Sequence, residues 1–211
     1  MESALREGGR EPGLKLIETM LWDGGKIPRI QLHLDRLNRS RALLGWVQPG
    51  VGFYWKCDVP LPAHPARVRL TIDAQGQAEW QVGALPLARP EWRLAVSQTR
   101  LSSTDPWLRV KSTRRGLYDT TRADLPGGID EIIFLNERDE VCEGTISTLF
   151  FDRGQGLRTP PLTCGVLPGV LRAELACPEE VLLARDLPHV RLWMGNALRG
   201  LIAARLESGQ E

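Results

Sequence analysis

DEIIFLNERDEVCEGTISTLFF, residues 130–151, contains apolar runs interrupted by a charged segment. The pattern predicts two strands joined at Asn136 to Asp139. Glu143 follows the second apolar run and directly precedes Gly144. A carboxylate in this position is either an ordinary turn residue or a side chain that the strand end presents for function.

The rest of the chain predicts a mixture of strands and helices in two halves. We expect strands at residues 14–22, 66–73, 77–85 and 92–98, a short extended piece at 26–30, and a strand, a turn and a last apolar segment within 187–206. We expect helices at residues 31–45, 113–123 and within 165–176. Residues 1–13 are predicted to be frayed. A proline-flanked stretch at 86–92 predicts an N-terminal domain of residues 1–86 and a C-terminal domain of residues 87–211.

Composition excludes several classes of protein. The chain has 211 residues, of which 42% are apolar and 25% charged, as in a soluble globular protein. Lys plus Arg is 27 and Asp plus Glu is 26, so no basic excess favours nucleic acid. The sequence has no signal-peptide pattern and no membrane-length apolar run, so we expect a cytoplasmic protein without a membrane partner. The four cysteines form no CxxC pair and have no histidine at metal-ligand spacing, so we expect free thiols and no metal.

Lysines are few in this chain: Lys15, Lys26, Lys56 and Lys111. Lys111 lies between a predicted strand end and the next helix, where a side chain can be aimed into a site. It is either a surface lysine or an amine that holds an aldehyde cofactor as a Schiff base. In the second case, Glu143 is the carboxylate that keeps the ring nitrogen of the cofactor protonated.

A phosphate group needs a cradle, and GVLPGVLR at residues 165–172 is the candidate. A loop with Gly and Pro enters a helix here, and the free backbone N–H groups of a helix start bind phosphate. Gly169, Val170 and Leu171 carry those groups, and Arg36 is the candidate guanidinium that completes the cradle. The alternative interpretation is an ordinary helix start.

These residues together resemble a family. The chain resembles the class IV aminotransferases, the fold-type-IV pyridoxal phosphate enzymes, which include branched-chain and D-amino acid aminotransferases and 4-amino-4-deoxychorismate lyase. Besides residues 130–151, the matching pieces in family order are IETMLWDGG at 17–25, HLDRLNRSRALLG at 33–45, KSTRRGLYD at 111–119, TPPLTCGVLPGVLR at 159–172 and MGNALRGLIAARL at 194–206.

The resemblance implies a D-amino acid aminotransferase-like α+β fold. A small α/β N-terminal domain would precede a larger, β-barrel-like C-terminal domain with helices. It also implies a homodimer and the cofactor pyridoxal 5′-phosphate.

The resemblance assigns roles to individual residues. Lys111 matches the Schiff-base lysine and proton shuttle, Arg36 the phosphate-binding arginine, and Glu143 the partner of the pyridine nitrogen. Tyr118 matches a tyrosine near the phenolic oxygen of the cofactor. Val170 and Leu171 match donors of backbone N–H groups to the phosphate, and Asn196 and Ala197 match the last turn on the phosphate side.

The short form of the chain resembles the lyase-type members most. In that reaction Lys111 removes the proton at the amine-bearing carbon of aminodeoxychorismate, pyruvate leaves, and 4-aminobenzoate forms. The substrate has two carboxylates, so Arg109, Arg114 and Arg115 are candidates to bind them, with a solvated helix start as the alternative.

Two other functions stay open. One is an aminotransferase that acts on branched-chain or D-amino acids with the same lysine. The other is a degenerate, non-catalytic domain, which Ala197, without a hydroxyl group, and the missing opening strand of the family permit.

Overall fold

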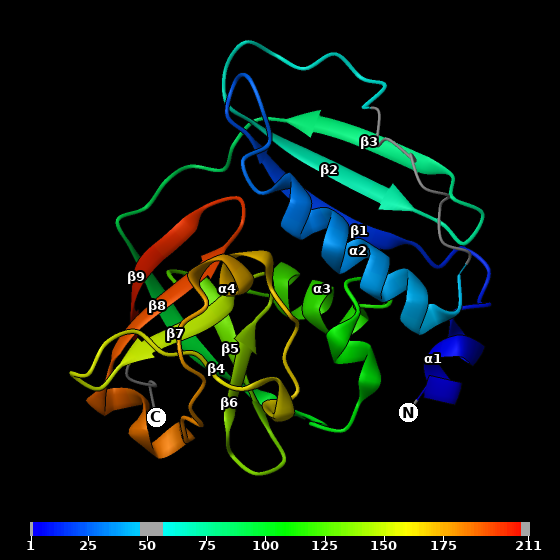
Figure 1. Ribbon diagram of the computed structural model, residues 1–211. Helices are drawn as coiled ribbons and strands as arrows, with labels where there is room; N and C mark the ends of the chain where they lie inside the picture. The colour runs from blue at the N-terminus through cyan, green and yellow to red at the C-terminus, as the bar shows by residue number, and fades with distance from the viewer. Residues whose placement is uncertain (1, 47–56, 208–211) are drawn as a thin grey trace. The chain divides into compact units, whose positions relative to one another are not determined.

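The computed structural model describes residues 2–46 and 57–207, and its elements are labelled in Figure 1. The chain forms two compact units. Unit 1 contains the described residues up to Leu87 together with Arg109–Arg114. Unit 2 contains Ala88–Leu108 and the described residues from Arg115 onward.

Unit 1 is a three-stranded antiparallel sheet with helices. Its elements are α1 (Glu2–Gly8), β1 (Leu16–Trp22), α2 (Ile30–Leu44), β2 (Ala66–Ile72) and β3 (Ala78–Gly83), with strand order β1-β2-β3. Alternating Val68, Leu70 and Ile72 are buried, as expected for a sheet with one covered face. Helix α2 contributes Leu37 and Leu44 to the core and ends at Gly45, which has φ +70° and is left-handed.

Two expectations about unit 1 are wrong. Residues 2–8 form helix α1 and are not frayed, because Leu5 is buried and the carbonyl of Gly9 accepts a hydrogen bond from Trp46 Nε1 at 2.8 Å. Residues 26–30 do not form a short strand. The Asp23 carboxylate instead accepts the N–H groups of Gly25 and Lys26 in a turn, and α2 begins at Ile30.

Unit 2 is a closed barrel with strand order β4-β5-β6-β7-β8-β9. Its strands are β4 (Glu91–Leu101), β5 (Glu131–Asn136), β6 (Val141–Gly144), β7 (Thr148–Asp152), β8 (Arg191–Asn196) and β9 (Gly200–Leu206). β4 pairs in parallel with β5 and β9, and the other pairs are antiparallel. The hairpin at Asn136 to Asp139 is confirmed, and so is the α+β class with a small sheet unit and a larger barrel unit.

The structure also contains the helices α3 (Gly116–Ala123) and α4 (Val170–Leu175). Its short 3-10 helices are η1 (Pro106–Arg109), η2 (Leu162–Cys164) and η3 (Ala184–His189). The helix expected from residue 113 begins at Gly116, because the Thr113 N–H donates to Lys15 O at 2.8 Å and Ser112 bridges to Leu16. Among the described residues, no helix combines the length and the apolar character that a membrane crossing requires.

The end of β6 has no room for a side chain. A Cβ atom at Gly144 would lie 2.8 Å from Glu131 Cδ, from Glu131 Cγ and from Met194 Cε. Both neighbours are fully buried, so neither can move away without disturbing the barrel.

We therefore expect Gly144→Ala to lower the free energy of unfolding by about 1–3 kcal/mol, the usual cost of an overpacked core. Urea titration measures it. Gly116→Ala is the matched control, because its Cβ would meet no atom within 4 Å. Equal stability of the two variants would show that the Gly144 site is looser than described.

Candidate active site

In unit 1, a buried carboxylate joins a helix to a strand. Glu18 on β1 accepts a hydrogen bond from Arg36 Nε at 2.9 Å through Oε1, and its Oε2 contacts Arg36 Nη2. His33, one helical turn before Arg36 on α2, places Nδ1 at 2.6 Å from the same Oε2. All three side chains are buried. The predicted phosphate arginine is thus held by Glu18, and its Nη1 takes no part in this pair.

The protonation states of Glu18 and His33 follow from their burial and from their neighbours. Burial opposes the ionisation of Glu18, but the Arg36 charge and the hydrogen bonds from His33 and Arg36 outweigh it and lower the pKa of Glu18 to about 2. Burial lowers the pKa of His33, against the raising effect of Glu18. A neutral His33 donates from Nδ1, so Nε2 is an acceptor, and it has no hydrogen-bond partner among the described residues.

Lys111 belongs to the same unit. Its carbonyl accepts the Ile17 N–H at 2.8 Å, which fixes its backbone beside β1. The side chain is half-buried, and its positive charge contributes to the lowered pKa of His33. Lys111 and Arg36, the two basic residues predicted for the cofactor, therefore share one electrostatic environment. Sequence reasoning missed Glu18 as the partner of Arg36 and His33, although it lies in the IETM motif.

In unit 2, Glu143 at the end of β6 is buried and accepts hydrogen bonds from a side chain and from the backbone. Tyr118 OH donates to Oε1 at 2.9 Å and the Leu167 N–H donates to Oε2 at 2.9 Å. Burial, followed by the Glu143 carboxylate, raises the pKa of Tyr118, so the phenol stays protonated and remains a donor. Its ring packs edge-on against Phe134, with 5.2 Å between centroids. Tyr118 therefore fixes the orientation of Glu143.

The predicted phosphate loop ends where α4 begins. Gly169 is the N-cap, with extended φ and ψ, and no side chain caps the helix start. A Cβ at Gly169 would lie 2.7 Å from Thr148 Oγ1. Val170 and Leu171 are buried in the first turn. Glycine at 169 thus permits the close approach of the Thr148 hydroxyl to the start of α4, where no side chain caps the helix.

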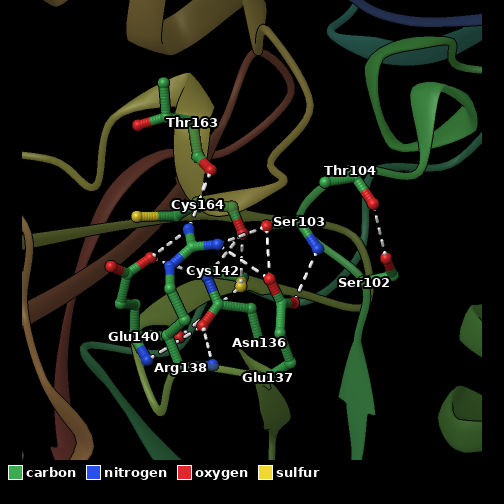
Figure 2. Close-up of polar contacts among 10 residues, drawn as sticks. All are labelled: Ser102, Ser103, Thr104, Asn136, Glu137, Arg138, Glu140, Cys142, Thr163 and Cys164. Carbon is green, nitrogen blue, oxygen red and sulfur yellow. Dashed lines mark hydrogen bonds and ion pairs between the residues drawn. The ribbon is translucent and has the colours of Figure 1, made fainter. Parts of the chain in front are cut away.

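Hydrogen bonds from the β5–β6 hairpin hold the segment that precedes this loop, as Figure 2 shows. Asn136 Nδ2 and Cys142 Sγ both donate to the carbonyl of Cys164 at 3.1 Å, and Arg138 Nη2 donates to Thr163 O at 3.2 Å. Burial raises the pKa of the Cys142 thiol, and it raises the pKa of the Cys164 thiol to about 12. All four cysteines are free thiols, as predicted.

The other predicted residues have structural contacts of their own. Asn196 caps its turn, because Oδ1 accepts the N–H groups of Leu198 at 3.1 Å and Arg199 at 3.0 Å, and Ala197 is buried within that turn. Arg115 donates to Asp119 at 2.7 Å and to Thr145 O at 2.9 Å. Arg114 forms an exposed ion pair with Glu11 at 2.9 Å, and Arg109 is exposed.

The structure thus groups the predicted residues by unit. Lys111 and Arg36 lie in unit 1 with Arg109 and Arg114. The members in unit 2 are Arg115, Tyr118, Glu143, Gly169, Val170, Leu171, Asn196 and Ala197. Sequence reasoning missed the Leu167 N–H as a partner of Glu143, because a backbone donor leaves no residue-type signal.

The chain belongs to the class IV aminotransferase family. The family model described as amino-transferase class IV matches residues 15–206, which confirms the resemblance seen in the sequence. The members of this family are enzymes, and the fold described above is the one that its solved structures share.

Individual relatives agree with this assignment. A protein of Schizosaccharomyces pombe named "Putative aminodeoxychorismate lyase" is 27% identical over 167 residues, which cover 76% of this chain and 72% of the relative. The crystal structure of a "Putative amino-acid aminotransferase" from Mesorhizobium loti has a TM-score of 0.81 and 38% identity, and the match covers 92% of this chain and 100% of that one. A hypothetical aminotransferase from Mycobacterium tuberculosis, solved in its PLP-bound form, shares the fold, with a TM-score of 0.77, 21% identity and coverage of 92% and 81%.

The Glu18 pair predicts acid sensitivity. The lowered pKa of Glu18 contributes stability that is present above its ordinary value of 4.5 and is lost as pH falls toward about 2. The lowered pKa of His33 acts with the same sign, because the unfolded chain takes up its proton from about 6.5 downward.

We expect Glu18→Gln to cost about 3–5 kcal/mol at pH 7, because it leaves the Arg36 charge buried without its partner. Because glutamine does not ionise, the variant should also lack the loss of stability that protonation of Glu18 causes as pH falls from 4.5 toward about 2. Urea unfolding between pH 7 and 3 measures both effects. Glu79→Gln, which breaks the exposed pair with Lys15, is the control and should change stability little. An unchanged acid profile in Glu18→Gln would contradict the assignment.

Tyr118→Phe tests the contact with Glu143 without altering the ring. A hydrogen bond to a charged group contributes about 1.5–3 kcal/mol, so we expect that loss in the wild-type background and a smaller one in a Glu143→Gln background. A double-mutant cycle of urea unfolding measures the coupling. Additive costs would mean that the phenol and the carboxylate do not act as a pair.

Proposed function

We propose that this protein is a pyridoxal 5′-phosphate-dependent 4-amino-4-deoxychorismate lyase that releases pyruvate and 4-aminobenzoate in the folate pathway. The observation that carries the proposal is the family match over residues 15–206 together with the Schizosaccharomyces pombe relative named for this activity. The retained Lys111, Arg36 and Glu143 support it.

The residues present fit this cofactor. Glu143 is a buried, ionisable partner for a ring nitrogen, and its orientation is fixed by Tyr118 and Leu167. On the phosphate side, the start of α4 has no side-chain cap, and Gly169 brings the Thr148 hydroxyl close to it, so backbone N–H groups and a hydroxyl would be available to a phosphate. The unpartnered His33 Nε2 beside Arg36 is a further polar atom that such a group, or a water next to it, can satisfy.

When bound, the cofactor supplies a ring that accepts electrons from the amine-bearing carbon of the substrate. In this proposal Lys111 Nζ takes the proton from that carbon. Glu143 holds a proton at the ring nitrogen, because a buried carboxylate favours the charged pyridinium. Arg36 would supply the positive charge for the phosphate, while its Nε and Nη2 stay on Glu18.

The two carboxylates of the substrate need cationic partners, and Arg109, Arg114 and Arg115 stay the candidates. Arg114 can exchange its exposed Glu11 pair for a substrate at little cost. Arg115 has less freedom, because it also holds the carbonyl of Thr145. Alanine at the arginine that binds should raise KM more than it lowers kcat, and unchanged kinetics in all three variants would remove this part of the proposal.

The second candidate function is a class IV aminotransferase for branched-chain or D-amino acids. The Mesorhizobium loti protein favours it, because that structure is 38% identical, is covered along its whole length and is named as an amino-acid aminotransferase. Both reactions use the same lysine, but the aminotransferase also requires a keto acid that accepts the amine. A non-catalytic domain is the third candidate.

The decisive experiment feeds purified protein with aminodeoxychorismate and added pyridoxal phosphate, and follows 4-aminobenzoate and pyruvate by chromatography. We expect both products in equal amounts without any keto acid. Turnover of amino acid and keto acid pairs alone would establish the aminotransferase instead. If the protein takes up no cofactor and forms no product, the third candidate, a non-catalytic domain, is supported instead.

Lys111→Ala is expected to abolish product formation and borohydride-stable labelling by the cofactor, because no other side chain is assigned to hold the aldehyde. Lys15→Ala is the matched control, since Lys15 lies in the same unit and its Nζ forms an ion pair with Glu79. Mass spectrometry of the reduced protein locates the label. A label on another lysine would contradict the assignment.

We also propose, from the family resemblance alone, that the protein forms a homodimer. Light scattering of the purified chain tests this, and a monomer at micromolar concentration that is fully active would disprove it.

A further inference from the structure

We propose that Glu131 is a positioning residue that holds the turn Thr145–Ser147 in the shape that the cofactor site needs. The inference rests on the proposed function, because its purpose is the alignment of residues that would bind pyridoxal phosphate. Glu131 is the first residue of β5 and is completely buried. Neither sequence reasoning nor the family resemblance assigned it a role.

Both carboxylate oxygens of Glu131 are used on one short turn. Oε1 accepts the Thr145 N–H at 3.1 Å and the Thr145 hydroxyl. Oε2 accepts the Ile146 N–H at 3.3 Å and the Ser147 hydroxyl at 2.6 Å. Arg122 Nη1, at 3.3 Å from Oε1, supplies a positive charge. A buried carboxylate with this many donors is satisfied and rigid, so the turn has little freedom.

Two carbonyl groups of this turn accept hydrogen bonds from residues predicted for the candidate site. Its Thr145 carbonyl accepts from Arg115 Nη2 at 2.9 Å, at the start of the helix that carries Tyr118. Its Ile146 carbonyl accepts from Asn196 Nδ2 at 3.2 Å, which fixes the turn that contains Ala197. One carboxylate therefore connects the tyrosine side of the site to the proposed phosphate side.

The residue at position 144 also leaves room for the Glu131 carboxylate. Gly144, between Glu143 and the turn, lacks the Cβ that would lie 2.8 Å from Glu131 Cδ. The glycine next to the ring-nitrogen partner is thus needed for the approach of Glu131. Sequence alone gives no such signal, because an acidic residue at the start of a strand is ordinary.

A second acidic turn on the same barrel provides the comparison. Asp152 Oδ1 accepts the N–H groups of Gly154, Gln155 and Gly156 at 2.6–2.9 Å, and its Oδ2 contacts Arg191. Asp152 is buried like Glu131, but its turn touches none of the proposed cofactor residues. A purely structural acid and a positioning acid can therefore be separated experimentally.

The test compares Glu131→Gln with Asp152→Asn in the full chain. Each amide keeps one acceptor oxygen and turns an NH2 group toward donors, so both variants should unfold at lower urea concentration than the wild type. Glu131→Gln should weaken the binding of pyridoxal phosphate about tenfold or more, since about 1.4 kcal/mol corresponds to a factor of ten. It should also speed amide hydrogen exchange at residues 145–147 and shift the absorption maximum of the bound cofactor.

Asp152→Asn should leave the cofactor affinity within about twofold and the absorption maximum unchanged, because a loss of global stability alone does not alter the affinity of the folded state. Ser147→Ala is the milder variant in case Glu131→Gln does not fold. It removes one donor to Oε2 and should weaken cofactor binding by a smaller factor.

The outcomes are distinct. Unchanged cofactor affinity in Glu131→Gln, or in Ser147→Ala if only that variant folds, overturns this inference and leaves the proposed function intact. An equal loss in Asp152→Asn also overturns it. A wild-type protein that takes up no pyridoxal phosphate overturns the proposed function, and the positioning role with it.

Discussion

A carboxylate that is removed from water must be met by donors or cations, and this constraint arranges both units of the protein. Glu18 in unit 1 binds Arg36 and His33, and Glu143 in unit 2 binds Tyr118 and the Leu167 N–H. Glu131 binds the turn that follows Glu143. Each acid lies on a strand, so the sheet fixes its backbone. The donors and cations that bind it therefore come from other segments of the chain.

The constraint explains why helices and loops lie where they do. α2 presents His33 and Arg36 to β1, because residues three apart in a helix share one face. The loop before α4 brings the Leu167 N–H to Glu143 and is held by Asn136 and Arg138 through the carbonyls of Cys164 and Thr163 (Figure 2). The order of the candidate phosphate loop thus depends on the β5–β6 hairpin.

Much of this fold was predictable, because its signals are local. The hairpin of residues 131–144 follows from apolar runs around a turn, and α2 follows from helical periodicity ended by Gly45. Non-local contacts were not predictable. The sequence predicts a helix from Thr113, but Thr113 bonds to Lys15 and Ser112 bridges to Leu16 of β1, so α3 begins at Gly116.

Some residues of the candidate site could likewise be predicted from the sequence, and others could not. Lys111, Arg36 and Glu143 could be selected because their residue types match the chemistry and the family motifs. Glu18 and Glu131 could not, because ordinary acids on strands become important only through donors that are distant in sequence. Leu167 acts through its backbone and has no residue-type signal at all.

The contact between Tyr118 and Glu143 also limits how a cofactor can lie. The resemblance placed Tyr118 beside the phenolic oxygen and Glu143 beside the pyridine nitrogen, but these atoms occupy different positions on the ring. A phenol that donates its single proton to Glu143 at 2.9 Å cannot donate it to the phenolic oxygen as well. If Glu143 serves the ring nitrogen, Tyr118 acts through that carboxylate by weakening its basicity. In that case the role of Tyr118 would be to orient the carboxylate and to lower its basicity, and its hydroxyl would not serve the phenolic oxygen.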